Sequence, residues 1–283
     1  MIYKSKKNES SSDNLENLRA DLALDHRKKC LFLDIDGTLC DFKINPNDCF
    51  IPSNTLFILD KILSYNIPVI AVTGRDFQSA HKLFKYINLP IAALHGSEIY
   101  LSHEKKIINS KKSLEISHIY KLLVDSCSPY PHFFIENKTT SIALHYRKCP
   151  ELHENAKKII LEIHELFPHL KLIEGKFVFE LISAEANKGL AIGKILALLN
   201  QTEIFTPIFI GDDQTDEDGF YFVNHYKNGI SIKVGDGLTH AKHRLRDINQ
   251  VYDFFSIFLE HIQNDGKNNL SSNNLSGEKT CLN

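Results

Sequence analysis

The chain lacks a strong excess of charge of either sign. Its 33 Lys and Arg nearly balance its 35 Asp and Glu, which leaves a formal net charge of -2 and a pI near 6.7. A strongly basic chain would favour nucleic acid or an anionic membrane as its partner, and this balance gives no such reason. We therefore expect no nucleic acid and no membrane among its partners.

Long apolar segments are lacking as well. No apolar run approaches the roughly 20 residues of a bilayer-spanning helix, and no apolar leader typical of a signal peptide is present. The six cysteines are scattered without a C-x-x-C pair, and Cys281 stands one position too late for a prenylation box. These absences predict a soluble, cytoplasmic protein, expected to be a monomer, whose cysteines are reduced thiols.

What the chain does contain is an alternation of apolar strands and amphipathic helices. Residues 30–35 and 68–72 are nearly continuous apolar runs, as in strands that are buried on both faces of a parallel sheet. Helices are predicted to start at Ser53, as an N-cap, and after Asp76, which can cap the helix that follows it. The predicted fold class is α/β, with a doubly wound, Rossmann-like parallel sheet as the core.

The middle of the chain changes character. Residues 132–136 and 141–146 resemble the two strands of a hairpin, an amphipathic helix follows over 151–167, and a strand returns at 177–182. Together these elements predict a small α+β lobe with an antiparallel sheet, inserted into the core. We call this lobe the cap.

The length of 283 residues suits one core domain with a modest insertion. We predict a core formed by residues 30–106 and 187–262, with the cap at 107–186. Both chain ends are rich in Asn, Ser and Lys and poor in apolar residues. Because such a composition cannot offset the entropy of ordering, we expect a flexible arm at 1–29 with nothing to bury and a disordered tail at 263–283.

Carboxylates cluster at two predicted strand ends. Asp34 and Asp36 stand in D-x-D-G-T, and Asp212, Asp213 and Asp216 stand in G-D-D-x-T-D. Taken alone, the first motif also fits a turn and the second a solvated acidic surface. In a doubly wound sheet, however, ligands bind at the carboxyl ends of the strands, and converging carboxylates need a cation between them. The oxygen ligands predict Mg²⁺ together with a phosphate oxygen.

Two further residues could serve a phosphate. Thr73 ends the second predicted strand, where its hydroxyl and the following backbone N–H groups can bind a phosphate oxygen at a helix start. Lys188 opens a predicted helix at 188–199, where a cation runs against the helix dipole unless an anion lies close by. Singly, Thr-Gly is a common turn, and an isolated Lys is usually a solvated surface residue.

As an ordered set, these elements resemble the signature of the haloacid dehalogenase-like phosphatases, over about residues 30–106 and 187–260. The resemblance implies that Asp34 is a covalent nucleophile and Asp36 the general acid that protonates the leaving oxygen. Thr73 and Lys188 would then neutralise charge around the phosphate.

The same resemblance implies a metal site. Asp34, the backbone carbonyl of Asp36 and Asp212 would hold Mg²⁺, while Asp213 and Asp216 would orient waters or Lys188. The cation would act as a clamp and a charge shield, because phosphoryl transfer depends mainly on positioning and electrostatics.

The cap carries more specific motifs. They are E-N-K-x-x-S-x-A-L-H-Y-R, G-K-x-x-x-E-L and N-K-G, together with L-H-G-S-E and G-D-D-x-T-D-E of the core. This pattern resembles the trehalose-6-phosphate phosphatases, and the resemblance implies hydrolysis of trehalose 6-phosphate, the last step of trehalose biosynthesis. It also implies that the substrate is bound by the side chains of Arg75, His95, Glu136, Lys138, Arg147, Lys176 and Glu180. Taken singly, each of these is as well explained as an ordinary exposed charge.

Other functions share parts of this pattern. A related sugar phosphatase, acting on sucrose 6-phosphate or mannosyl-phosphoglycerate, would have the same core and a similarly placed cap. A non-catalytic sugar-phosphate sensor on this fold would tolerate loss of the nucleophile or the acid, yet Asp34 and Asp36 are both present. A phosphoacceptor receiver domain also places an Asp at a strand end but would not need a cap.

Overall fold

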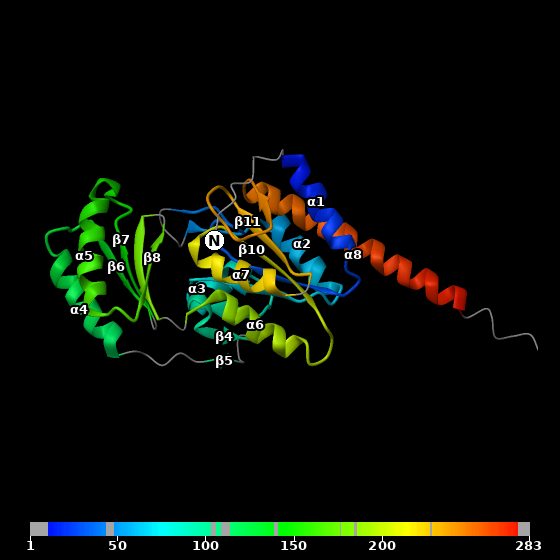
Figure 1. The fold of residues 1–283 in the computed structure, drawn as a ribbon, viewed down its shortest axis with the longest axis horizontal. Helices are drawn as coiled ribbons and strands as arrows, with labels where there is room; N and C mark the ends of the chain where they lie inside the picture. The colour runs from blue at the N-terminus through cyan, green and yellow to red at the C-terminus, as the bar shows by residue number, and fades with distance from the viewer. Residues whose placement is uncertain are drawn as a thin grey trace, which may run out of the picture.

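The computed structural model describes residues 11–43, 48–102, 106–108, 114–138, 141–175, 177–183, 186–226 and 228–276. These form two lobes, each built on its own sheet (Figure 1). The α/β fold class with a separate antiparallel cap sheet is thereby confirmed. No helix in the described part of the chain is long and apolar enough to cross a membrane.

The larger lobe contains an eight-stranded sheet. Its strands are, in spatial order, β12 (His243–Leu245), β11 (Ile230–Val234), β10 (Thr206–Gly211), β1 (Lys29–Leu33), β2 (Val69–Val72), β3 (Ile91–Ala93), β4 (Glu98–Tyr100) and β5 (Lys106–Ile108). The pairs from β12 to β3 are parallel, and the pairs β3–β4 and β4–β5 are antiparallel. This order places β10, β1 and β2 side by side, so their carboxyl ends share one edge of the sheet.

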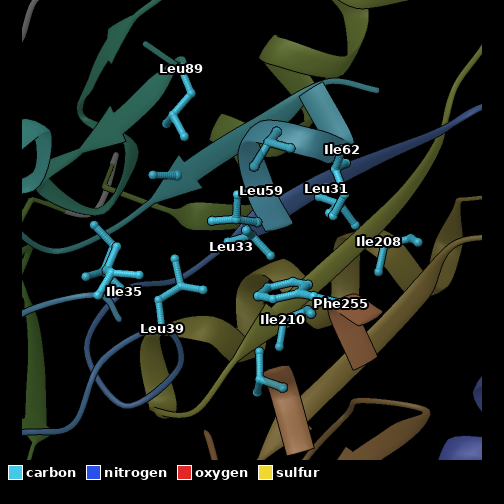
Figure 2. Packing of buried hydrophobic residues seen from close by; sticks show 14 of the residues in the cluster. Leu31, Leu33, Ile35, Leu39, Leu59, Ile62, Leu89, Ile208, Ile210 and Phe255 are labelled. Carbon is cyan, nitrogen blue, oxygen red and sulfur yellow. The ribbon is translucent and has the colours of Figure 1, made fainter. Parts of the chain in front are cut away.

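Helices cover both faces of this sheet, which explains the continuous apolar runs. Leu31 and Leu33 of β1 pack in a cluster with residues of α2 (Ser53–Ser64) and α8 (Ile248–Ser276) (Figure 2). Cys30 and Phe32 of the same strand point to the other face, against α6 (Lys188–Leu199) and α7 (Glu217–His225). Because successive side chains of a strand alternate between faces, a strand covered on both sides has no polar position.

The cap has a four-stranded antiparallel sheet in the order β6 (Phe134–Asn137), β7 (Ser141–His145), β9 (Val178–Ile182) and β8 (Lys171–Gly175). Helices α4 (Leu114–Cys127) and α5 (His153–Leu166) cover one of its faces and share its apolar cluster. These elements lie between Leu114 and Ile182, and residues 107–108 of the predicted cap span belong to β5 of the larger sheet.

One of the two predicted helix starts differs in the structure. Ser53 is the first helical residue of α2 and not its N-cap; Pro52 holds the N-cap position and makes no side-chain cap. Asp76 does cap α3 (Phe77–Phe84), accepting a hydrogen bond from the Ser79 backbone at 3.0 Å. Proline suits the first positions of a helix because it lacks the N–H that would otherwise need a partner there.

The expectation of an N-terminal arm with nothing to bury is wrong for α1 (Ser11–Ala23). This helix packs on α8 and β12, and Leu18 and Leu22 are fully buried there. Asp21 of α1 also accepts a bond from His243 of β12 at 2.8 Å. The composition is polar, but the apolar residues recur at helical spacing and meet a distant part of the chain.

The C-terminal segment also differs from the prediction of a disordered tail. Helix α8 continues through residues 263–276 and extends away from the larger lobe (Figure 1). Residues 277–283 lie outside the described part of the chain. The helix is nucleated by its buried first turns, which contain Phe254, Phe255 and Phe258, and each further residue then adds one hydrogen bond.

The prediction that all cysteines are reduced is wrong for Cys40 and Cys49, which form a disulfide. The loop after β1 brings their Cα atoms to 6.3 Å, within the range that a disulfide can span. Cys30, Cys127 and Cys149 are free and buried, and Cys281 lies outside the described residues.

We expect Leu22→Ala to lower the free energy of unfolding by about 2–4 kcal/mol, because it leaves a cavity under α1. The matched control is Leu24→Ala, since Leu24 is 76% exposed just after the same helix. Chemical denaturation monitored by circular dichroism measures both variants. Equal, small effects would mean that α1 does not dock on the core.

Candidate active site

Three neighbouring strands deliver polar side chains to one edge of the larger sheet. Asp34 follows β1, Thr73 follows β2 and Asp212 follows β10. The Asp34 backbone N–H bonds the carbonyl of Ile210 at 2.9 Å, which continues the ladder beyond the strand end. Asp34 and Thr73 are both buried. The structure thus brings together residues separated by more than 170 positions, as the strand-end argument predicts.

Lys188 lies between two carboxylates at this edge, those of Asp34 and Asp216. It opens α6, whose N-cap Asn187 accepts a bond from the Leu190 backbone at 2.8 Å. Its Nζ donates to Asp34 Oδ1 at 2.7 Å and to Asp216 Oδ1 at 2.7 Å. Burial by itself would lower the pKa of Lys188, but Asp216 and Asp34 hold it well above its usual value. The lysine is therefore a fixed buried cation beside the Asp34 carboxylate.

The acidic loop after β10 is ordered by hydrogen bonds between its own residues. Asp213 is the N-cap of the short 3-10 helix η4 (Gln214–Asp216) and accepts from the Thr215 backbone at 2.7 Å. Asp216 is fully buried, and its Oδ2 accepts from the backbone N–H groups of Asp212 and Asp213 at 2.9 and 3.0 Å. Both Asp216 oxygens are thus used within the protein, and this residue orients Lys188.

Asp212 differs from Asp216 in its hydrogen bonding. Its Oδ1 is buried and has no hydrogen-bond partner among the residues that the structure describes. Burial, with Asp216 and Asp213 nearby, raises the pKa of Asp212 to about 8. Burial also raises the pKa of Asp34 well above its usual value, which Lys188 only partly offsets. An uncompensated buried carboxylate of this kind requires a proton or a cation.

The donors fit a magnesium ion. Carboxylate oxygens of Asp34, Asp212 and Asp216 all lie within 4.8 Å of one another. Gly37 keeps this space open: a Cβ there would lie 2.0 Å from Asp212 Oδ2, and its φ of +84° suits glycine. Hard oxygen donors with room for waters are the ligands that Mg²⁺ prefers. Of the three, Asp34 and Asp212 retain oxygens for the metal, because Asp216 is already engaged.

Asp36 points to a different partner. Its carboxylate forms a two-point ion pair with Arg75, at 2.6 and 2.5 Å, and remains partly exposed. The Arg75 backbone N–H in turn bonds Thr73 Oγ1 at 3.1 Å. Burial would lower the pKa of Arg75, but Asp36 raises it, so the guanidinium stays charged. A cation and a hydroxyl thus flank Asp34 on the β2 side.

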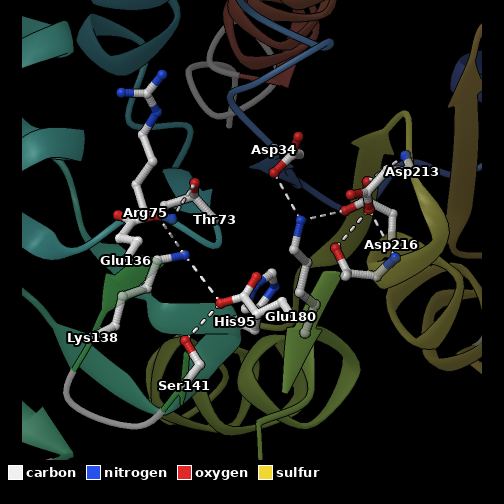
Figure 3. Close-up of polar contacts among 12 residues, drawn as sticks. Asp34, Thr73, Arg75, His95, Glu136, Lys138, Ser141, Glu180, Asp213 and Asp216 are labelled. Atoms are coloured by element: carbon white, nitrogen blue, oxygen red, sulfur yellow. Dashed lines mark hydrogen bonds and ion pairs between the residues drawn. The ribbon is translucent and has the colours of Figure 1, made fainter. Parts of the chain in front are cut away.

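The cap presents a charged network to this edge. Glu180 Oε1 accepts from Lys138 Nζ at 3.0 Å and from Ser141 Oγ at 2.6 Å (Figure 3). His95 Nε2 of the core lies 3.4 Å from the other Glu180 oxygen. Burial would raise the pKa of Glu180, but Lys138, with His95 and Ser141, holds it well below its usual value. The buried Glu180 carboxylate and the half-buried Lys138 ammonium therefore remain charged.

The three remaining predicted residues differ in where they lie. Glu136 belongs to the network, with His145 Nε2 at 3.0 Å and Lys138 Nζ at 3.7 Å. Arg147 contacts the core, and its Nη1 donates to the backbone carbonyl of Lys43 at 2.6 Å. Lys176 lies outside the described residues.

Core and cap together enclose a cavity of about 650 Å³. Its wall contains Asp34, Asp36, Thr73 and Lys188 from the core, and Phe134, Glu136, Lys138, His145, Arg147 and Glu180 from the cap. All the predicted catalytic residues and most predicted substrate-binding residues thus line one space.

Sequence reasoning missed Ser141 and His145 as members of the site. Both lie on β7, whose Ile142 and Leu144 pack toward the helices of the cap. Ser141 and His145 alternate with these apolar residues, so they share the opposite face. The period-two pattern of this strand was the available signal. Phe42 and Lys43, which also line the cavity, carry no such signal.

Comparison with known proteins agrees with this geometry. The family model described as trehalose-phosphatase matches residues 32–249. A trehalose-6-phosphate phosphatase of Escherichia coli (strain K12) is 32% identical over 256 residues, which cover 86% of this chain and 91% of that protein.

Two solved structures share the fold. The C-terminal domain of a C. albicans trehalose-6-phosphate phosphatase superposes with a TM-score of 0.77 at 21% identity, over 87% of this chain and 97% of that one. A haloacid dehalogenase-like hydrolase from Bacteroides thetaiotaomicron has a TM-score of 0.60 at 16% identity, over 82% and 98% of the two chains. The resemblance inferred from the motifs is confirmed.

We expect the metal-free protein to lose stability as the pH rises from about 4 to about 8. The unfolded chain releases the Asp212 proton near the usual pKa of 3.8, whereas the folded protein retains it to about 8. Asp212→Asn removes this cost, so its melting temperature in EDTA at about pH 8 should exceed that of the wild type by at least about 2 °C. Mg²⁺ should raise the melting temperature of the wild type and not of this variant.

The matched control is Asp236→Asn, which changes an exposed aspartate of the same lobe. Differential scanning fluorimetry with and without Mg²⁺ measures all three proteins. A Mg²⁺ shift that survives in Asp212→Asn would place the metal elsewhere.

Proposed function

The chain belongs to the trehalose-phosphatase family, and from this premise we propose that it hydrolyses trehalose 6-phosphate to trehalose and phosphate. One observation carries the proposal: a single cavity joins the Asp34–Lys188 pair of the core to a charged polar face of the cap. The core side of the cavity contains the residues proposed for the reaction, and the cap side contains groups suited to binding a sugar. The reaction is the last step of trehalose biosynthesis.

Asp34 is the proposed nucleophile. Its carboxylate oxygen attacks phosphorus, the bond to the sugar oxygen breaks, and an aspartyl-phosphate forms. A buried carboxylate attacks an anionic phosphate only where both charges are partly neutralised, and Lys188 at 2.7 Å supplies one fixed positive charge. Thr73 and the backbone at the start of α3 offer donors to the phosphate oxygens. Bound Mg²⁺ would be held by Asp34 and Asp212 and would supply the remaining charge neutralisation.

Asp36 is the proposed general acid and base. In its protonated form it gives a proton to the leaving sugar oxygen, and as a carboxylate it then takes a proton from the water that attacks the aspartyl-phosphate. That second attack releases inorganic phosphate and restores Asp34. The position of Asp36 supports this assignment, because Arg75 holds its carboxylate at the wall of the cavity that also contains Asp34.

The cap would bind the disaccharide. Glu136, Lys138, Glu180 and His145 lie on one face of its sheet, where pairing with Lys138 keeps the pKa of Glu180 well below its usual value. Sugar hydroxyls can both donate and accept, so alternating acceptors and donors can satisfy several of them at once. Such a site favours a ligand that carries hydroxyls, because binding removes water from these polar groups and the hydroxyls replace the lost hydrogen bonds.

Phosphate release in the presence of Mg²⁺ tests the proposal. The panel contains trehalose 6-phosphate, sucrose 6-phosphate, mannosyl-phosphoglycerate and the small ester p-nitrophenyl phosphate. We expect kcat/KM to be highest for the trehalose ester. A preference for either of the other sugar esters would replace the substrate assignment, and no turnover of any ester would favour a sensor.

The nucleophile has its own test. Asp34→Asn should abolish phosphate release from every ester, because the amide cannot form the aspartyl-phosphate. The fold should persist, as judged by circular dichroism, and Asp236→Asn again serves as the matched control. Normal turnover by Asp34→Asn would exclude covalent catalysis by this residue.

The sugar-binding face is tested by Lys138→Met. Loss of the ammonium leaves Glu180 buried without its main countercharge, so kcat/KM for trehalose 6-phosphate should fall about tenfold or more relative to that for p-nitrophenyl phosphate. The control is Lys158→Met, which changes a lysine of α5 whose side chain is 78% exposed. An equal loss with both esters would mean that Lys138 serves the phosphate and not the sugar.

A further inference from the structure

Arg147 connects the cap to the core at the wall of the cavity. It follows β7 in the cap, yet its Nη1 donates to the backbone carbonyl of Lys43 at 2.6 Å. Its guanidinium carbon also lies 4.2 Å from the ring centroid of Phe42, a cation–π distance. Phe42 and Lys43 both line the cavity that contains Asp34.

The core side of this contact is held by a covalent link. Phe42 and Lys43 follow Cys40, which is joined to Cys49 by the disulfide. Cys40 is fixed in turn, because its carbonyl accepts from the Gly37 backbone at 2.8 Å and its N–H bonds the Ile35 carbonyl at 3.1 Å. The chain at Cys40 therefore cannot move without disturbing the loop that carries Asp36 and Gly37.

The Cys49 end approaches the same loop. Its sulfur lies 3.8 Å from Asp36 Oδ1, and both cysteines are buried. The two sulfurs are bonded to each other, so neither donates to Asp36 and neither is free to bind a metal. Their effect on the site is positional.

We propose that the Cys40–Cys49 disulfide and Phe42 form the core half of a latch, on which Arg147 closes the cap over the substrate. Phe42 and Arg147 are positioning residues in this role, and the latch determines specificity for a substrate that needs the closed cap. The inference rests on the proposed function, because it concerns the binding of the sugar ester.

The chemistry of the contact favours a latch over a phosphate-binding role for Arg147 alone. A planar guanidinium that stacks on the Phe42 ring and donates from Nη1 to the Lys43 carbonyl is held in one orientation against the core. Another charged contact between the lobes, Lys171 with Asp218 at 3.2 Å, is exposed and lies outside the substrate cavity. The Arg147 contact instead borders the space that a sugar must fill.

The test compares two esters. Trehalose 6-phosphate needs the cap, and p-nitrophenyl phosphate is too small to reach its polar face. The readout is the ratio of their kcat/KM values, which does not change if a variant merely folds less well, because the active fraction cancels. Phe42→Leu and the double variant Cys40→Ala/Cys49→Ala should each lower this ratio about threefold or more, the scale of a cation–π contact.

Phe57→Leu is the matched control. Phe57 also lies beneath a cation, Lys61, at 5.5 Å, but on α2 and away from the cavity. Its ratio should equal that of the wild type. The variant that combines Phe42→Leu with both cysteine changes should fall no further than the lower of its parents, because the disulfide and the ring act through one contact. If the triple variant instead lowered the ratio by the product of its parents' effects, the latch proposal would be disproved.

Reduction gives an independent test of the disulfide. Dithiothreitol should lower the wild-type ratio to that of Cys40→Ala/Cys49→Ala and leave that variant unchanged. Alkylation of the unreduced, denatured wild type should modify two fewer cysteines than after reduction. Alkylation of all six without reductant would overturn the proposal.

Failure of the latch and failure of the proposed function are distinguishable. A wild-type enzyme that does not prefer the trehalose ester would disprove the function. A wild type with that preference, whose ratio is unchanged in Phe42→Leu and in the cysteine variant, would disprove the latch alone.

Discussion

The buried ion pairs of Lys188 are the interaction on which the site depends. A lysine removed from water is tolerated only when its charge is matched, and Asp34 and Asp216 match it at 2.7 Å each. These three residues come from the start of α6, the end of β1 and the loop after β10. The ion pairs thus tie the two halves of the core together across the inserted cap. Loss of Lys188 would leave two buried carboxylates without their shared cation, so the lysine fixes this edge as one unit.

The same principle of compensated charge operates in the cap. Buried Glu180 and half-buried Lys138 stay ionised because each faces the other, while the far face of their sheet is apolar and packs on helices. Because side chains alternate along a strand, the charged residues lie on one face of the sheet and the apolar residues on the other. The cap can therefore present charges to a substrate and still have a hydrophobic core. The cavity between the lobes combines this face with the electrostatics of the core edge.

The failures of sequence reasoning share one physical cause. The docking of α1 and the disulfide between Cys40 and Cys49 are contacts that local composition and short motifs do not encode. A polar helix with two buried leucines looks like a loose arm until its partner α8 is in place. The sequence analysis predicted Arg147 as a substrate-binding residue, but its contact with Phe42 appears only in the fold. The docking of α1 depends on segments that lie far apart in the chain, and the disulfide depends on how one loop folds.

The sequence by itself determined the parallel core, the inserted antiparallel cap and the polar residues at the carboxyl ends of the core strands. It could do so because strands buried on both faces leave continuous apolar runs, and because the carboxyl ends of parallel strands collect polar side chains. Only the tertiary structure decided the partner of each charge: Asp216 pairs with Lys188, Asp36 pairs with Arg75, and Asp212 Oδ1 is buried with no partner among the described residues. Motifs name the carboxylates, but burial and distance assign their tasks, because the free energy of a charge depends on what surrounds it.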